Sequence, residues 1–385
     1  MFQEIYDIHK KIKRMKNNLK IINIKKVFLN YLNMKKNKTS KSKCINEKQI
    51  IEKNQEEKEN QETQEYKKFI AHKIKPIGEI DAETDFETLR TMVSAALLSK
   101  NDDIASGSGI EFNERCRIGN NIVDFFTFQE RLETRGKYDV TFYDFVKNIE
   151  EFKKKKFIQN MFTYYATVKN ARGLKNEYIV LKEVYNICIS AINIFRPLMA
   201  VELYAKYKPS VVLDPCAGWG GRAVGAAVCG ENVRYFGIDV NHSLQIPYQN
   251  MCAFLNSKCN STLGSSSSPR IRMTIADAVT YDYSQIEPKY DMVFTSPPYY
   301  FIEKYSHNPF YNNSKDDMDE QFYAPLFSNT FLHLLPGGCM ALNVNREIYE
   351  RVCVRLFGHA HQTMNCKKSK RQNDYREMIY IWTKK

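Results

Sequence analysis

Two short segments of the chain combine residues that can bind a ligand with residues that can do chemistry. The first is Val211-Val212-Leu213-Asp214-Pro215-Cys216-Ala217-Gly218-Trp219-Gly220-Gly221-Arg222, and the second is Asp291-Met292-Val293-Phe294-Thr295-Ser296-Pro297-Pro298-Tyr299-Tyr300. In each, an apolar run stops at residues that cannot extend a strand, as at a parallel strand that ends in an active-site loop. The first segment is typical of a cofactor loop and the second of a catalytic loop.

The glycines of the first segment allow two kinds of ligand. They let the backbone approach a ligand closely, at the amino end of the helix expected to follow. Gly218, Gly220 and Ala223 also satisfy the Gly-x-Gly-x-x-Gly/Ala pattern of a dinucleotide turn. Asp239, at the end of the next expected strand, lies where a ribose-binding acid belongs. A nicotinamide-dependent oxidoreductase is therefore a competing interpretation.

Two features argue against the oxidoreductase. Asp214 lies where it would attract the ammonium and sulfonium groups of a cationic methionine moiety, whereas it would repel a pyrophosphate. The second feature is the Ser-Pro-Pro-Tyr segment, for which a nicotinamide enzyme has no use.

Segment 195–300 resembles the S-adenosylmethionine-dependent amino-methyltransferases that act on exocyclic amino groups of adenine or cytosine in DNA. Their glycine loop is typically Asp-Pro-Phe-x-Gly-x-Gly-Thr, where this chain has Asp-Pro-Cys-Ala-Gly-Trp-Gly-Gly. Their catalytic tetrapeptide is Asp, Asn or Ser followed by Pro-Pro-Tyr. The resemblance implies S-adenosylmethionine as cofactor, held by Phe195, Asp214, Pro215, Ala217, Gly218, Gly220, Asp239 and Asp277, and a catalytic group of Ser296, Pro297, Pro298 and Tyr299.

The mechanism follows from the low nucleophilicity of an exocyclic amino nitrogen, whose lone pair is conjugated into the ring. Acceptors that hold both N–H groups turn the lone pair toward the methyl carbon. The Ser296 hydroxyl and the Pro297 carbonyl can supply them, with consecutive prolines fixing the backbone. Tyr299 would stack on the base after it leaves the helix.

Two residues of the glycine loop depart from the family pattern. Pro215-Cys216 resembles the Pro-Cys of enzymes that methylate carbon 5 of cytosine through a thiolate, but it lies in the cofactor loop and no Gln follows. We therefore do not expect Cys216 to be a nucleophile. Trp219 stands where a small residue is common, and either walls the cofactor pocket or fills the core.

The expected fold class is α/β: a Rossmann-like class I methyltransferase with a mostly parallel seven-stranded sheet, an antiparallel C-terminal hairpin and an N-terminal helical domain. Alternating strand and helix signals from residue 196 onward support the sheet. The expected strands are Val211 to Leu213, Tyr235 to Asp239, Arg272 to Ile275, Met292 to Phe294, Cys339 to Val344 and Met378 to Trp382. We expect a capped helix start at Asp85 and a strand-like run from Asn121 to Phe128.

At 385 residues and 43% hydrophobic, the chain can bury about two domains. We expect a basic amphipathic helical arm at 1–34, a polar linker, disordered, at 35–66, a helical domain at 67–194 that is a candidate for target recognition, and the methyltransferase domain at 195–385. The net charge of +13 is concentrated at the start, because residues 1–43 hold thirteen Lys and Arg against two acids. Such an arm usually meets nucleic acid or another anionic surface.

The ten cysteines contain no Cys-x-x-Cys, and the seven histidines show no ligand spacing. We therefore expect reduced thiols and no metal. Neither a membrane-spanning run nor a secretory signal is recognised, so a soluble, intracellular protein is expected, in the cytoplasm or the nucleus.

We expect an enzyme that methylates a DNA base at N4 of cytosine or N6 of adenine, with cytosine slightly favoured because Ser begins the tetrapeptide. The partner is DNA, with RNA less favoured, and the oligomeric state is left open. One alternative is the same chemistry on RNA or on a protein glutamine, where relatives more often carry Asn in place of Ser296. The other is a non-catalytic subunit that keeps the fold and binds nucleic acid.

Overall fold

The computed structural model describes residues 63–101, 110–136, 138–190, 192–230, 233–259, 269–300, 314–366 and 377–385. The chain divides into two compact units, residues 1–66 and residues 67–385. The predicted arm at 1–34 and nearly all of the predicted linker at 35–66 lie outside the described residues. The fold described below is that of the second unit.

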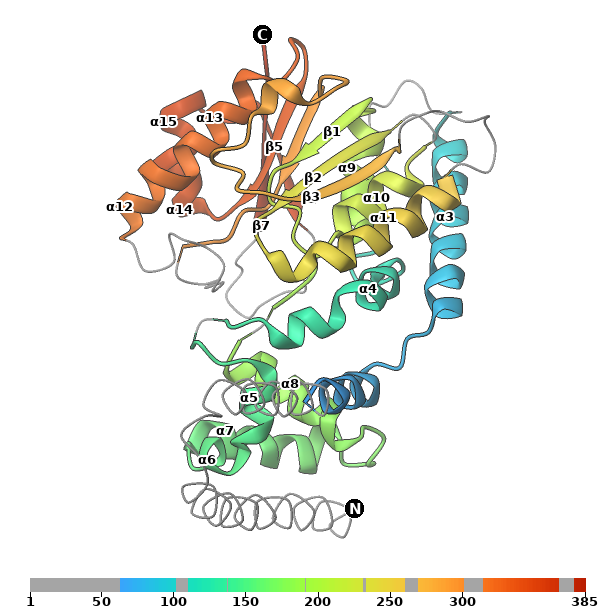
Figure 1. The fold of residues 1–385 in the computed structure, drawn as a ribbon, viewed down its shortest axis with the longest axis vertical. Coiled ribbons are helices and arrows are strands. Elements are labelled where there is room, and N and C mark those ends of the chain that lie inside the picture. Colours follow the sequence, from blue (N-terminus) through green and yellow to red (C-terminus); the bar gives the residue numbers. More distant parts are fainter. Residues whose placement is uncertain are drawn as a thin grey trace, which may run out of the picture. The chain divides into compact units, whose positions relative to one another are not determined.

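A seven-stranded sheet runs through this unit in the order β3-β2-β1-β4-β5-β7-β6 (Figure 1). All neighbours from β3 to β5 pair in parallel, whereas β7 is antiparallel to both β5 and β6. The strands are β1 (Val211–Asp214), β2 (Arg234–Asp239), β3 (Ile271–Ile275), β4 (Met292–Thr295), β5 (Cys339–Val344), β6 (Gln362–Cys366) and β7 (Glu377–Thr383). The predicted Rossmann-like sheet with its antiparallel hairpin is confirmed.

Helices cover both faces of the sheet, which explains why β1, β4 and β5 are buried at every position. Figure 1 shows one group of helices on one face and a second group on the other. The first group is α9 (Pro197–Tyr207), α10 (Gly221–Val228) and α11 (Gln245–Cys259), and the second is α12 (Lys315–Met318), α13 (Ala324–Leu332), α14 (Arg346–Ile348) and α15 (Val354–Phe357). Short 3-10 segments are η2 (His242–Leu244) and η3 (Tyr283–Gln285), and π-helical segments are η4 (Asp319–Tyr323) and η5 (Tyr349–Cys353).

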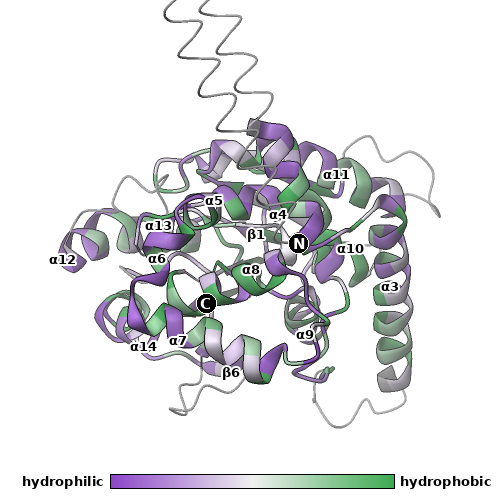
Figure 2. Ribbon diagram, turned by 90° about the horizontal axis from the view of Figure 1, so that it is seen from below, coloured by the Kyte–Doolittle hydropathy of each residue, from purple (hydrophilic) through white to green (hydrophobic). Residues whose placement is uncertain are grey.

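The described elements before residue 195 are helical, and they pack in two groups. Helix α3 (Glu79–Asn101) and the first half of α4 (Asn120–Glu133) share the hydrophobic core of the α9–α11 face. The end of α4 joins a smaller core with α5 (Phe142–Lys147), α6 (Ile149–Lys153), α7 (Lys156–Tyr164), η1 (Tyr165–Lys169) and α8 (Glu177–Cys188). Hydrophilic and hydrophobic residues alternate in bands along α3 (Figure 2). The domain boundary at 194/195 stays a prediction.

Two local predictions in this region are wrong. The run 121–128 is not a strand but part of α4, because Ile122, Val123 and Thr127 lie together on its buried face at helical spacing. The helix expected to start at Asp85 starts at Glu79 instead. The Asp85 carboxylate accepts hydrogen bonds from the N–H groups of residues 119 and 121, 2.8 and 3.0 Å away, and so caps the start of α4.

Candidate active site

The two segments singled out by the sequence meet at one edge of the sheet. Strands β1 and β4 are neighbours, with Val212 opposite Met292, so their carboxyl ends lie side by side where the strand order reverses. The loops that follow are joined by a hydrogen bond of 3.1 Å from the Cys216 N–H to the Thr295 Oγ1. Ligands of open α/β sheets bind at such a point.

Two glycines shape the loop after β1. Gly220 has φ 83 and precedes the first residue of α10, and a Cβ there would lie 2.5 Å from the Met251 Sδ. A Cβ on Gly221 would overlap the carbonyl oxygen of Phe195. The loop therefore needs glycine at both positions, and the predicted cofactor residue Phe195 lies directly against it.

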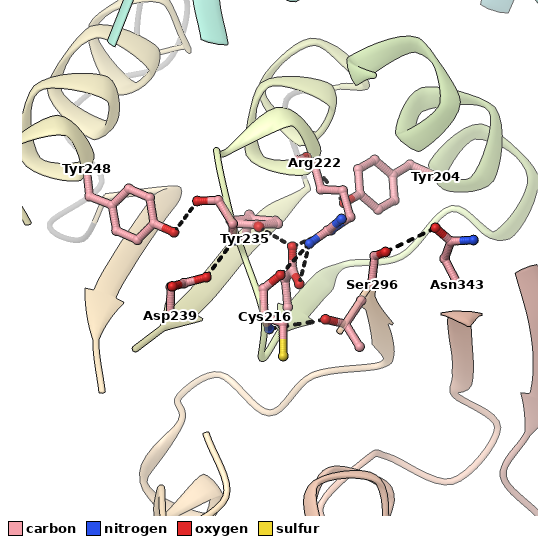
Figure 3. Close-up of polar contacts among 11 residues, drawn as sticks. Tyr204, Cys216, Arg222, Tyr235, Asp239, Tyr248, Ser296 and Asn343 are labelled. Carbon is pink, nitrogen blue, oxygen red and sulfur yellow. Dashed lines mark hydrogen bonds and ion pairs between the residues drawn. The ribbon is translucent and has the colours of Figure 1, made fainter. Parts of the chain in front are cut away.

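Asp214 is placed differently from the expectation. Its carboxylate is fully buried and accepts hydrogen bonds from the Arg222 Nε (2.5 Å) and Nη2 (3.2 Å) and from the Tyr235 hydroxyl (2.5 Å) (Figure 3). Its charge is thus balanced inside the protein, and the prediction that it attracts a cationic ligand directly is not matched by this arrangement. Arg222 also donates to the Cys216 carbonyl, so the ion pair fixes the loop.

Arg222 was missed because nothing in its spacing indicates a partner. Burial lowers the pKa of its guanidinium, whereas the Asp214 carboxylate, together with Tyr235 and Tyr204, raises it by more, so the net shift is upward. The guanidinium lies 5.0 Å from the centre of the Phe195 ring, a cation–π contact that ties Phe195 to the same cluster.

Asp239 ends β2 and touches the glycine loop. One of its oxygens accepts the Gly218 N–H at 2.8 Å, and the Tyr248 hydroxyl donates to the Gly218 carbonyl at 2.5 Å (Figure 3). The other oxygen accepts the Asn241 N–H at 2.9 Å. Burial raises the pKa of Asp239. A carboxylate has about four acceptor positions, so two remain for ligand hydroxyls.

The remaining predicted cofactor residues also lie at this edge. Asp277 is exposed just after β3 and accepts the Val279 N–H at 2.9 Å. Pro215 lies in the turn directly after β1. Ala217 is buried, and its N–H donates to the Ile238 carbonyl at 2.8 Å.

The two departures from the family pattern have plain structural roles. Burial, with Asp239 and Asp214 nearby, raises the pKa of the Cys216 thiol far above its usual range. A thiolate nucleophile is therefore disfavoured at this position. Trp219 belongs to the hydrophobic core on the α9–α11 face, so it fills core.

Ser296 begins the loop after β4 and is half-buried. Its hydroxyl donates to the Asn343 Oδ1 at 3.1 Å (Figure 3). The Asn343 Nδ2 donates to the Met378 carbonyl at 3.1 Å, which turns its Oδ1 toward Ser296. Because the only hydroxyl hydrogen of Ser296 is given to Asn343, its oxygen faces any ligand as an acceptor. Asn343, fully buried in β5, was missed because it appears in the sequence as one polar residue in an apolar strand.

The two tyrosines of the loop are anchored by their hydroxyls. Tyr299, 7% exposed, donates to the Glu377 Oε1 at 2.5 Å, and its hydroxyl lies 3.1 Å from the Asn343 carbonyl oxygen. Tyr300, 4% exposed, donates to the Asp319 Oδ1 at 2.6 Å. Stacking of Tyr299 on a base stays a prediction, and the structure adds an anchoring role for both rings.

Within the described part of the chain, no group of three or more His, Cys, Asp or Glu side chains is arranged to hold a metal ion. Among the described helices, none combines the length and apolar character needed to span a membrane.

No protein-family model matches this sequence, and no curated protein matches it. Solved structures with some likeness include TrmN from Thermus thermophilus, at 18% identity over 49% of this chain and 48% of that one, with a TM-score of 0.33. Others are the N-methyltransferase NodS from Bradyrhizobium japonicum WM9 (13%, 49% and 92%, TM-score 0.30) and an rRNA methylase from Streptococcus thermophilus (12%, 50% and 99%, TM-score 0.30). The match spans about half the length of TrmN. At these scores, the fold assignment rests on the strand order and register of the chain itself.

Proposed function

We propose that this protein transfers a methyl group from S-adenosylmethionine to the exocyclic amino group of a DNA base, at N4 of cytosine or N6 of adenine. The observation that carries the proposal is the bonding of Ser296. This residue sits at the carboxyl edge of β4 with its hydrogen engaged by Asn343, so its oxygen is an acceptor beside the glycine loop.

An acceptor is what an amino group needs at this position. The Ser296 oxygen takes one N–H of the base, and the Pro297 carbonyl takes the other. The nitrogen lone pair then points at the methyl carbon rather than into the ring. Such a reaction gains most of its rate from orientation and from fixed dipoles, which a loop tied to the sheet supplies. Pro298 and Tyr299 keep the two acceptors in place.

The residues of the first loop and its neighbours suit the uncharged groups of S-adenosylmethionine, namely its ribose and its adenine ring. The free acceptor positions of Asp239 suit ribose hydroxyls, and the exposed Asp277 suits the amino group of the adenine ring. Gly218 and Gly220 let the backbone lie close to the ligand. When bound, the cofactor supplies an electrophilic methyl group. Asp214 contributes indirectly, through the ion pair with Arg222 that sets the shape of the loop.

DNA as partner is supported by a basic surface on the helical part, which we define as residues 153–176. This stretch holds seven Lys and Arg and no acid, and three of these cations, Lys153, Lys154 and Lys175, pair with glutamates outside it. Phe157 and Tyr164 are 53% and 42% exposed within it. Lysines beside exposed aromatic rings can neutralise phosphates and stack on bases. The surface lies in the segment expected to recognise the target.

The reaction is tested with labelled S-adenosylmethionine, separate DNA, RNA and protein substrates, and digestion of labelled DNA to nucleosides. We expect label in N4-methylcytosine or N6-methyladenine. Label only in RNA or protein would show that DNA is not the substrate. Intact cofactor binding without transfer to any substrate would favour the non-catalytic subunit.

A paired variant separates the two loops. Ser296→Ala with Pro297→Ala should abolish transfer and leave cofactor affinity nearly unchanged, because those groups are assigned to the base. The matched control is Pro209→Ala with Ser210→Ala, directly before β1 at the opposite edge of the sheet, which should leave both properties unchanged. Loss of cofactor binding in the first variant would contradict the assigned roles.

The basic surface has its own test. Lys156→Ser with Lys169→Ser should lower the slope of log affinity for DNA against log salt by about 2, since each phosphate contact contributes about 0.9. Arg355→Ser with Lys385→Ser removes the same charge from exposed positions outside this surface and should leave the slope unchanged. Equal slopes for the two variants would show that DNA does not lie on the basic surface.

A further inference from the structure

One tyrosine hydroxyl holds the turn that follows the two prolines. The Tyr300 N–H donates to the Tyr323 Oη at 3.0 Å, and the Tyr323 hydroxyl donates to the Pro298 carbonyl oxygen at 2.6 Å. The hydroxyl therefore bridges the acceptor and the donor on either side of Tyr299. Tyr300 has φ 31, a left-handed conformation that a residue other than glycine adopts only where its surroundings hold it.

Tyr323 is itself fixed by an irregular helix. It ends the π-helical segment η4, where the Ala324 N–H bonds to the Asp319 carbonyl five residues earlier. Pro325 follows and has no N–H to give to the carbonyl four residues before it, which favours the wider turn. The Tyr323 ring is fully buried and meets the Tyr300 ring edge to face, with 5.4 Å between centres. Its hydroxyl has little freedom to leave the turn.

The same helical segment holds the side chain of Tyr300. Its hydroxyl donates to the Asp319 Oδ1 at 2.6 Å, and the Arg351 Nε donates to the Asp319 Oδ2 at 2.8 Å. Tyr300 is thus held by η4 at its backbone and at its ring. Pro298 is held at its carbonyl.

We propose that Tyr323 is a positioning residue for methyl transfer, a proposal that rests on the proposed function of the site. By fixing the peptide groups at Pro298 and Tyr300, its hydroxyl sets the direction of the Pro297 carbonyl immediately upstream, which is the second acceptor for the amino group. Without the bridge, the left-handed turn relaxes and this carbonyl rotates away. Tyr323 touches neither the base nor the cofactor in this scheme.

The test compares Tyr323→Phe with Tyr290→Phe. Tyr290 is also fully buried, and its hydroxyl donates to the Thr330 carbonyl at 2.8 Å, away from the tetrapeptide loop. Each variant loses one buried hydroxyl bonded to a carbonyl. For Tyr323→Phe we expect kcat to fall about 10- to 100-fold, as for a small misplacement of a reacting group, with KM for DNA and Kd for S-adenosylmethionine within about twofold. Tyr290→Phe should keep all three within about twofold.

A second measurement tests the hydrogen bonds of the Tyr323 hydroxyl independently of catalysis. Hydrogen exchange of the Tyr300 amide should be faster in Tyr323→Phe than in the wild-type protein and unchanged in Tyr290→Phe. Equal kcat values for the two variants, or an unchanged Tyr300 amide, would overturn the proposal. If the wild-type protein methylates no substrate, the proposed function is wrong. The role of Tyr323 in holding the turn is tested independently: it is wrong if the Tyr300 amide exchanges as slowly in Tyr323→Phe as in the wild-type protein.

Discussion

The two loops of the site are held in opposite ways. Most bonds of the glycine loop come from residues close to it in the chain: Arg222 is 8 residues from Asp214, and Tyr248 is 30 residues from Gly218. The exception is the bond from the Cys216 N–H to Thr295, 79 residues later at the end of β4. The tetrapeptide loop is bonded by residues that all come later in the chain, from Asp319, 19 residues after Tyr300, to strands β5 and β7. Asn343 lies 47 residues after Ser296, and Glu377 lies 78 residues after Tyr299.

Because different parts of the chain hold the two loops, cofactor binding and methyl transfer should respond to different mutations. The glycine loop forms with β1, β2, the helices between them and Thr295 at the end of β4, so cofactor binding should tolerate damage in β5, β7 and η4. The tetrapeptide loop is correct only when β5, β7 and η4 are in place. Mutations in β5, β7 and η4 should therefore impair transfer before they impair cofactor binding.

The largest expected effect is the loss of stability when the ion pair inside the glycine loop is removed. Arg222→Met leaves Asp214 buried without its cation, which should cost about 3 to 5 kcal/mol in the free energy of unfolding, measured by urea denaturation. The double variant Asp214→Asn with Arg222→Met removes both charges and should recover part of this loss. A loss no larger than that of the exposed Arg355→Met would show that the ion pair does not hold the loop.

The next effect tests whether cofactor affinity belongs to the glycine loop alone. Asp239→Asn removes a charged acceptor that touches Gly218, so we expect Kd for S-adenosylmethionine to rise by about 10-fold or more, measured by titration calorimetry. Ser284→Ala, an exposed change in η3 after the neighbouring strand, is the control and should leave Kd unchanged. An unchanged Kd for Asp239→Asn would remove this carboxylate from the cofactor site.

A smaller effect tests the long-range support of the tetrapeptide. Asn343→Ala frees the Ser296 hydroxyl hydrogen, which can then point at the substrate and repel an amino donor. We expect kcat to fall about 10-fold, the equivalent of one hydrogen bond, with Kd for the cofactor unchanged. A parallel change in both constants would mean that the two loops are not supported separately.

The smallest expected effect concerns Glu130, which lies outside both loops and so serves as a control for changes in cofactor affinity. Burial, with the charge of Glu133 as a further cause, raises the pKa of Glu130 from 4.5 to about 7. Between these values the folded protein keeps a proton that the unfolded chain releases, so this residue makes stability fall as pH rises from about 4.5 to 7. Glu130→Gln should therefore be more stable than wild type at pH 8 and show a flatter pH profile of melting temperature. The cofactor Kd should not change.

The sequence predicts the sheet well and its surroundings less well. Six strands were recognisable because each is an apolar run that ends at turn residues. Strand β6 was missed because Gln362–Cys366 is an edge strand with mostly exposed residues and no apolar run. The run 121–128 was assigned to a strand because its β-branched and aromatic residues favour strands, but the packing of α4 against the sheet helices decides its structure.

The candidate site was predictable where its residues are consecutive and not where partners meet through the fold. Gly218, Asp239 and Ser296 could be found from motifs. Asn343 and Tyr323 could not, because their roles depend on the register of β5 and on the irregular turn of η4. The same limit explains Arg222, whose ion pair with Asp214 depends on how the glycine loop folds.

The hairpin of β6 and β7 has a consequence for protein synthesis. Strand β7 lies between β5 and β6 and carries the carboxylate that receives the Tyr299 hydroxyl. Domains generally fold as units during synthesis. The carboxylate that anchors Tyr299 is made 78 residues after the ring it holds. The tetrapeptide loop therefore cannot take its final form until β7 has been synthesised and has paired with β5.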